Sequence, residues 1–244
     1  GYSYSVKEDQ APAGYVRNTA DIYSFKFTYT NDKEAKVSFA HTFSNDRVTA
    51  KINLYKVDKE TGKAVPQGDA VLNGAVYGLY AREDIGHPDG ATGVIYKAGE
   101  QVASLTTDEK GQASVDSLYL GKYYVKEISA PDGFVTTEEI QEFMFAYAGE
   151  ETAEVSYDFT FENQPTTVEL TKSDLTTGKE LPGAHLKVTD EKGNTVDEWT
   201  STTEPHVIKE LVVGKKYTMT ETKPADGYVT AESIAFTVEN TAEI

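Results

Sequence analysis

Short stretches of alternating apolar and polar residues run along the chain, and turn residues separate them. Val168 and Leu170, for example, alternate with Thr167 and Glu169, and turn segments such as 191–194 interrupt the pattern. Alternation with a period of two is typical of strands that bury one face. Many short strands between turns indicate an antiparallel β-sandwich. We therefore predict an all-β protein without long amphipathic helices.

Internal repeats organise these strands. The segments Tyr4–Tyr15, Tyr123–Phe134 and Tyr217–Tyr228 each begin with a strand pattern, carry a Glu at their fifth position and end in a Pro/Gly turn. A second pattern has Lys followed by Asp two positions later and then by Thr-Gly, and it occurs in Ile52–Gly62 and Val168–Gly178. The chain is therefore expected to be a tandem array of similar units.

The ends of the units follow from a third pattern. A Phe-x-Asn sequence occurs at Phe43–Asn45 and Phe161–Asn163, at nearly the same distance from the preceding motif Glu. The same spacing would place the third Asn beyond Ile244, and we expect Asn240 to lie in the loop before that last strand. The predicted units are 1–48, the C-terminal part of a repeat; 49–165, a complete repeat; and 166–244, a repeat that lacks its last strand.

Polar residues of three kinds fall on the apolar faces of these strands. Lys56 shares a face with Leu54, Glu127 with Val125, and Asn163 with Phe161, because residues two apart in a strand point to the same side. The flanking units repeat the pattern with four residues: Glu8, Asn45, Lys172 and Glu221. The complete unit is thus predicted to place one Lys, one Glu and one Asn together in a sandwich core.

Burial gives such a trio a specific chemistry. Low dielectric favours the uncharged forms of amines and carboxylic acids. A neutral amine is a nucleophile, and a protonated acid can pass its proton to a leaving group. Attack of Lys56 on the side-chain amide of Asn163, assisted by Glu127, would release ammonia and leave an isopeptide bond. The alternative is an ordinary buried salt bridge, or side chains that snorkel at the sheet edge.

These motifs resemble the Cna B-type repeats, also called SpaA-type or prealbumin-like domains, of Gram-positive surface adhesins and pilins. The resemblance extends over nearly the whole chain. It implies prealbumin-like or Ig-like β-sandwiches in which Lys56 and Asn163 are cross-linked and Glu127 is catalytic. It also implies that Glu8 and Asn45 form one half-site and Lys172 and Glu221 another, with Glu8 and Glu221 in the catalytic position. The implied location is extracellular, in a surface protein attached to the cell wall.

Composition narrows the range of partners and cofactors. The net charge is −17, which argues against nucleic-acid binding, and no apolar run reaches the roughly 20 residues of a membrane span. The absence of Cys excludes disulfides and thiolate metal sites. The acidic pairs Glu138-Glu139 and Glu150-Glu151 are interpreted as solvated surface rather than calcium sites. We expect no metal and no cofactor.

The first functional hypothesis is a structural stalk segment of a bacterial cell-surface adhesin or pilin, whose only chemistry is a single-turnover reaction on itself. Its partners would be neighbouring repeats of the same chain. The second is an adhesin module that binds a host matrix protein or glycan through loops such as 83–99, an insertion that the third repeat lacks. A third is a non-catalytic sandwich appended to a secreted enzyme.

Overall fold

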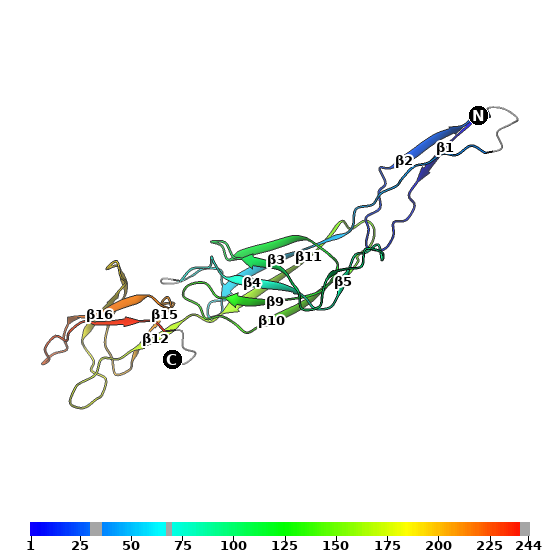
Figure 1. Ribbon diagram of the computed structural model, residues 1–244. Helices are drawn as coiled ribbons and strands as arrows, with labels where there is room; N and C mark the ends of the chain where they lie inside the picture. The colour runs from blue at the N-terminus through cyan, green and yellow to red at the C-terminus, as the bar shows by residue number, and fades with distance from the viewer. Residues whose placement is uncertain (30–35, 67–69, 240–244) are drawn as a thin grey trace.

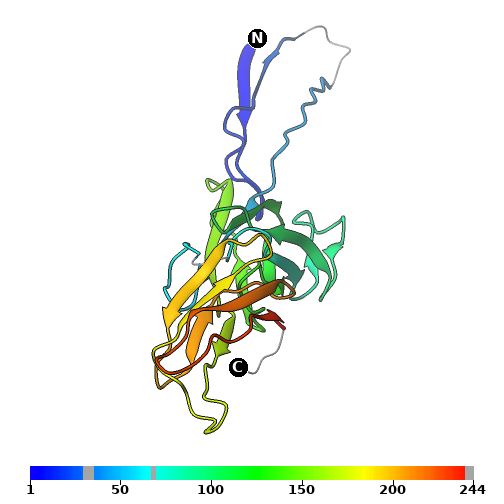
Figure 2. The same cartoon turned by 90° about the vertical axis from the view of Figure 1, so that its left-hand side faces the viewer.

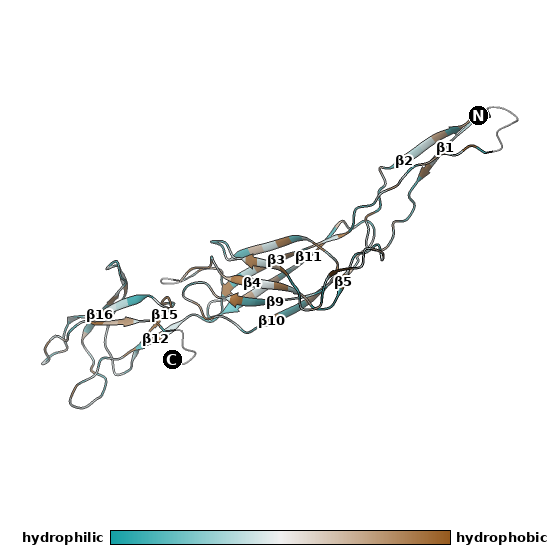
Figure 3. Ribbon diagram, viewed as in Figure 1, coloured by the Kyte–Doolittle hydropathy of each residue, from teal (hydrophilic) through white to brown (hydrophobic). Residues whose placement is uncertain are grey.

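The computed structural model describes residues 1–29, 36–66 and 70–239, and Figure 1 shows three parts arranged in a row. Within these residues the chain forms 17 β-strands. None of the described residues belongs to a helix that could cross a membrane. The expectation of an all-β fold is confirmed, and Figure 3 shows hydrophobic and hydrophilic positions interleaved along the strands.

The N-terminal part is an antiparallel hairpin of β1 (Tyr2–Lys7) and β2 (Ile22–Phe27), which projects from the rest of the molecule in Figures 1 and 2. All residues of β1 are exposed. The predicted strand before Asn45 is not formed, although the ring of Phe39 contacts the ring of Phe25 in a tilted arrangement with centroids 4.5 Å apart. The physical reason is that no other strand among the described residues is placed to pair with that segment.

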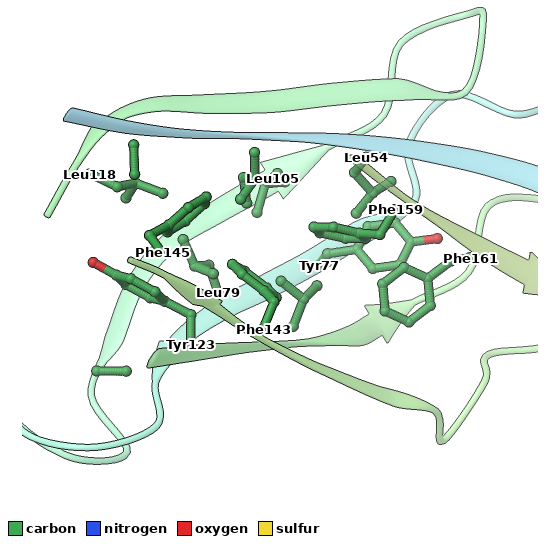
Figure 4. Close-up of a cluster of buried hydrophobic side chains, with 14 of the residues drawn as sticks. Leu54, Tyr77, Leu79, Leu105, Leu118, Tyr123, Phe143, Phe145, Phe159 and Phe161 are labelled. Carbon is green, nitrogen blue, oxygen red and sulfur yellow. The ribbon is translucent and has the colours of Figure 1, made fainter. Parts of the chain in front are cut away.

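The central part is a sandwich of two sheets. One sheet has the order β10-β9-β4-β7 and the other β11-β3-β8. Their bounds are β3 Thr49–Asp58, β4 Val76–Ala81, β7 Gln101–Thr106, β8 Gln112–Leu118, β9 Gly121–Ser129, β10 Ile140–Phe145 and β11 Glu154–Asn163. The core lies between the two sheets, where Tyr77, Phe143 and Phe161 are buried, as Figure 4 shows. Each fully buried side chain of this size contributes about 1.5–3 kcal/mol.

The first and last strands of this sandwich are parallel neighbours. In the register of β3 and β11, Phe161 lies opposite Lys56 and Asn163 opposite Asp58. Along β3 every second residue is buried, and Lys56 is one of them. The side chains of Lys56 and Asn163 therefore enter the core from adjacent strands, near the same ends of both.

The C-terminal part repeats this arrangement with fewer strands. A sheet of order β14-β13-β16-β17 accompanies a pair formed by β12 and β15. The bounds are β12 Thr167–Leu170, β13 His185–Thr189, β14 Thr195–Thr200, β15 His206–Lys209, β16 Lys216–Lys223 and β17 Ile234–Thr237. Because β12 ends at Leu170, Lys172 follows the strand and does not lie within it, which corrects our expectation for that residue. Asn240 lies outside the described residues.

The insertion 83–99 forms a small hairpin of β5 (Ile85–Gly86) and β6 (Val94–Tyr96). Its Pro88 packs directly on Gly14 of the N-terminal part, since a Cβ built on Gly14 would lie 2.6 Å from the Pro88 Cβ. Gly14 has a φ of +89°, and no larger residue would fit there. The insertion thus contacts the preceding part of the chain.

Candidate functional site

Glu127 is held at the centre of the site by a backbone cradle. It lies on β9, and its Oε2 accepts hydrogen bonds from the Thr137 backbone N–H at 2.7 Å and from Asn163 Nδ2 at 2.5 Å. The Pro/Gly turn after β9 returns the chain so that residue 137 reaches back to the side chain. The other carboxyl oxygen, Oε1, is buried without a hydrogen bond. One oxygen of the carboxyl group is therefore anchored, and the other lies in the core without a hydrogen bond.

Asn163, the last residue of β11, is fully buried, and two acceptors hold its side-chain amide nitrogen. Its Nδ2 donates to Glu127 Oε2 and, at 2.9 Å, to the backbone carbonyl of Val135. Its Oδ1 has no hydrogen-bond partner. The nitrogen that would leave as ammonia is thus the atom that contacts the carboxyl group.

Lys56 supplies the amine. Its side chain is fully buried, and its Nζ makes no hydrogen bond. The Nζ lies 3.6 Å from the ring centroid of Phe134, the last residue of the second repeat motif. Burial lowers the pKa of Lys56 from 10.5 to about 8, although the charges of Glu127, Asp58 and Glu210 act in the opposite direction. A neutral, nucleophilic amine is therefore accessible near physiological pH.

Two further polar residues line the same core. Asp58 is fully buried; its Oδ1 accepts hydrogen bonds from the backbone of the following turn, whereas its Oδ2 has none. Tyr77 lies opposite Glu127 in the register of β4 and β9, and burial together with the Glu127 carboxylate raises the pKa of its hydroxyl. The sequence did not indicate that Asp58 and Tyr77 lie near Lys56 and Glu127. Alternation shows which face of a strand a residue occupies, but not which residues it meets on other strands.

The arrangement is suited to amide exchange. Attack of Lys56 Nζ on Asn163 Cγ would form a C–N bond and break the Cγ–Nδ2 bond. The amine proton would pass through the carboxyl group of Glu127 to Nδ2, which would leave as ammonia. Atoms balance, because a primary amine and a primary amide give a secondary amide and ammonia. The surrounding apolar core excludes the water that would compete as a nucleophile.

The N-terminal half-site shows the same geometry without a lysine. Asn45 Nδ2 donates to Glu8 Oε2 at 2.6 Å and to the Val16 carbonyl at 2.8 Å. The backbone N–H of Asn18 also donates to Glu8 Oε2, at 2.9 Å. Glu8 and Asn45 are thus brought together as the sequence indicated, and both are partly exposed.

The C-terminal half-site has the lysine but no described acceptor. Lys172 Nζ lies 3.2 Å from Glu221 Oε1 in an ion pair, and the Lys172 side chain is 16% exposed. Glu221 Oε2 accepts a hydrogen bond from the Ala231 backbone N–H at 2.5 Å. A cleft of about 180 Å³ adjoins this pair. The structure therefore brings Lys172 and Glu221 together as partners of each other.

The family assignment comes from comparison with known proteins. The SpaA-type prealbumin-like fold domain matches residues 50–158 and 166–244. This chain belongs to that family. The two matched segments include Lys56, Glu127, Lys172 and Glu221, while Asn163 follows the end of the first. Curated protein sequences gave no match.

Among solved structures, the Bacillus anthracis TIE protein is 27% identical, with a TM-score of 0.63. That match covers 98% of this SpaA-type chain but 39% of the TIE protein, so the chain spans about two-fifths of that relative's length. A C-terminal fragment of the pilus adhesin SpaC from Lactobacillus rhamnosus GG is 17% identical, with a TM-score of 0.47. That match covers 80% of this chain and 84% of the SpaC fragment. The shaft pilin SpaA of the same organism is also 17% identical, with a TM-score of 0.33, and the match covers 80% of this chain and 94% of that pilin.

Proposed function

We propose that this chain is a structural stalk segment of a bacterial surface adhesin or pilus, built from repeats 1–48, 49–165 and 166–244 and located outside the cell, attached to the wall. The repeat 49–165 is locked by an isopeptide bond between Lys56 and Asn163 that forms once with the help of Glu127. The observation that carries the proposal is the buried trio: an amine without a hydrogen bond on β3, and on the adjacent strand β11 a carboxamide whose nitrogen contacts a carboxyl group. The chain would not be an enzyme that acts on other molecules.

The position of the bond explains its mechanical value. The chain enters the sandwich at the start of β3 and leaves it at the end of β11, so tension shears these two parallel strands. The bond would join the C-terminal ends of β3 and β11. Force would then pass along β3, through the bond and directly into the chain that leaves the repeat. The residues between 56 and 163 would then carry no load. By analogy with disulfides, closing a loop of about 100 residues contributes roughly 4–5 kcal/mol to stability.

Contacts between the repeats support a stiff array. At the first junction, Pro88 packs on Gly14 and Arg17 pairs with Glu150 at 3.4 Å. At the second junction, Lys209 pairs with Glu60. These contacts restrict bending between neighbouring units, which a stalk requires.

The alternative function is binding of a host matrix protein or glycan through loops such as 83–99. In favour of it, loops on a rigid sandwich are frequent binding sites. However, Pro88 at the tip of this insertion is already engaged with Gly14. Three clefts in the described residues hold about 180, 190 and 260 Å³, below the roughly 300–1,000 Å³ of typical ligand sites. The stalk is therefore the function that the geometry supports better.

Single-molecule pulling from the two ends of the full chain tests the stalk function. With the bond in place, the residues between 56 and 163 should add no extension at any force that leaves covalent bonds intact. The Lys56→Ala variant should release an additional length of roughly 350 Å, the span of about 106 extended residues. A wild-type chain that shows the same extra length as Lys56→Ala would contradict the proposal. Lys59→Ala, an exposed lysine just after β3, is the control and should behave like wild type.

A further inference from the structure

Tyr77 faces the carboxyl group of the site from the neighbouring strand. It lies on β4 directly opposite Glu127 of β9 in the antiparallel register, so both side chains point to the same face of the sheet. Tyr77 is 0% exposed, and its ring packs on Phe161 with centroids 4.9 Å apart (Figure 4). Phe161 lies two residues before Asn163 on β11. Tyr77 thus pairs with the strand of Glu127 and packs against the strand of Asn163.

Two buried oxygen atoms of this cross-strand pair lack a hydrogen bond. They are the Tyr77 hydroxyl and Glu127 Oε1, while Oε2 of the same carboxyl group is held by Thr137 and Asn163. Burial and, second, the charge of Glu127 raise the pKa of the Tyr77 hydroxyl, so it keeps its proton and remains a donor. A buried donor and a buried acceptor without partners cost free energy, and pairing them removes that cost. Catalytic hydrogen bonds are often long or poorly aligned before a reaction and tighten during it.

The third repeat shows that packing does not require a hydroxyl at this place. Its matched residue is Leu186, which follows the same Gly-Ala pair and lies opposite Glu221 in the register of β13 and β16. Leu186 is buried, so an aliphatic side chain can fill this position. Oε1 of Glu221 has a different partner there, since it lies 3.2 Å from Lys172 Nζ. The buried hydroxyl of Tyr77 is therefore not demanded by the fold, and it points to a role at the Glu127 carboxyl group.

We propose that Tyr77 is a positioning residue for Glu127: its hydroxyl donates a hydrogen bond to Oε1 and holds the carboxyl group in the orientation that isopeptide formation needs. The inference rests on the proposed function of that site. With Oε1 engaged by this donor, the proton from the Lys56 amine is carried on Oε2, the oxygen in contact with Asn163 Nδ2. Oε2 delivers that proton to Nδ2 as the Cγ–Nδ2 bond breaks and ammonia leaves. The hydroxyl keeps its own proton, so the balance of the reaction is unchanged.

The first test follows the rate of ammonia loss by intact mass in the newly synthesised full chain. Tyr77→Phe keeps the ring against Phe161 and removes only the hydroxyl, so it should slow the reaction roughly 10- to 100-fold, the loss expected for one hydrogen bond to a charged group. Tyr77→Leu, which installs the residue of the third repeat, should slow it at least as much. Tyr123→Phe is the matched control, because it removes the hydroxyl of another fully buried tyrosine in the same core, and it should react at the wild-type rate.

A second measurement separates positioning from packing. In a Lys56→Met background the bond cannot form, and the carbon NMR signal of the Glu127 carboxyl group reports the hydrogen bonds that this group accepts. Adding Tyr77→Phe should shift the Glu127 signal, because the donor to Oε1 is lost while the ring is kept. Adding Tyr123→Phe should leave the signal unchanged.

A Tyr77→Phe chain that loses ammonia at the wild-type rate would overturn the inference, and so would a Glu127 signal that does not respond to Tyr77→Phe. Equal slowing in Tyr123→Phe would also overturn it, since the effect would then come from core packing. In each of these cases the unmutated chain still loses ammonia, and only the inference fails. If the unmutated chain never loses ammonia, the proposed function itself fails.

Discussion

The central and C-terminal lysine sites start from the same motifs and end in different states. Lys56 is fully buried without a hydrogen bond, whereas Lys172 is partly exposed and paired with Glu221 at 3.2 Å. The glutamates, in contrast, are held alike, since each accepts a hydrogen bond from the backbone N–H ten residues later in the chain. The N-terminal Glu8 has the same contact with Asn18.

This difference separates the part of the site that the local sequence encodes from the part that depends on contacts with distant segments. The glutamate cradle is encoded within the motif and its turn, so it forms in all three parts of the chain. The buried lysine without a hydrogen bond lies where β11 pairs with β3 and brings Asn163. Among the described residues of the C-terminal part no strand occupies the place of β11, and Lys172 forms an ion pair with Glu221. We therefore expect a reactive lysine only where the sandwich includes that strand.

The largest expected effect comes from removing the catalytic carboxyl group. Glu127→Ala should prevent bond formation, restore the full sequence mass and lower the stability of the central repeat by about 4–5 kcal/mol. Chemical denaturation combined with intact mass measures both. Glu138→Ala, an exposed neighbour in the chain, should keep the bond and lose little stability. A Glu127→Ala protein that still lacks one ammonia would show that another group performs the proton transfer.

The pH dependence of bond formation should follow Lys56. Its pKa, lowered by burial to about 8, means that the neutral fraction rises about tenfold per pH unit below pH 8 and levels off above it. The rate of ammonia loss in newly synthesised protein, read by mass at pH 6 to 9, should show this profile. A rate that is constant over this range would indicate that the amine is already neutral or that another step limits the reaction.

The lowered pKa of Lys56 also predicts how the free energy of unfolding changes with pH in a chain that has not formed the bond. In Asn163→Ala, the unfolded chain binds more protons than the folded chain between pH 8 and 10.5, because the folded pKa of Lys56 is the lower one. Stability should therefore rise with pH in this window, by at most about 1.4 kcal/mol per unit. Urea denaturation midpoints measure it. Lys56→Met in the same background should remove the slope, and a slope that persists would assign it to other groups.

A smaller effect is expected from exchanging one aromatic residue between the sites. The position of Phe134 is occupied by Tyr228 in the third repeat, where the hydroxyl donates to Asp174 Oδ2 at 2.5 Å. The equivalent Asp58 Oδ2 is buried without a hydrogen bond. Phe134→Tyr should supply that bond and stabilise the central repeat by about 0.5–1.5 kcal/mol. The reverse change, Tyr228→Phe, is the matched control and should destabilise the third repeat; a loss of stability in Phe134→Tyr would contradict the account of Asp58.

Much of this could be predicted from the sequence because a strand has a period of two. That period placed Lys56, Glu127 and Asn163 on buried faces, where the structure has them, and the all-β class and the family are confirmed. The repeat boundaries stay a prediction. For Lys172 the alternation led to a wrong prediction, because it placed this residue within a strand, whereas β12 ends at Leu170. Alternation along the sequence does not show where the pairing of a strand ends.

The remaining features depend on contacts between distant segments. Phe134 recurs in the motif alignment as an aromatic position, but nothing local shows that its ring would contact Lys56. Glu210 lies in a segment without a motif, and Pro88 lies in an insertion that we had considered for ligand binding. All three residues lie near segments that are distant in the sequence, so their surroundings become visible only in the folded chain.

The most direct test of the central claim is the intact mass of the unmutated chain, with fragmentation of its proteolytic peptides. The account predicts a mass one ammonia below that of the sequence, together with a branched peptide that joins Lys56 to Asn163. The full sequence mass, with Lys56 and Asn163 recovered in separate linear peptides, would contradict it.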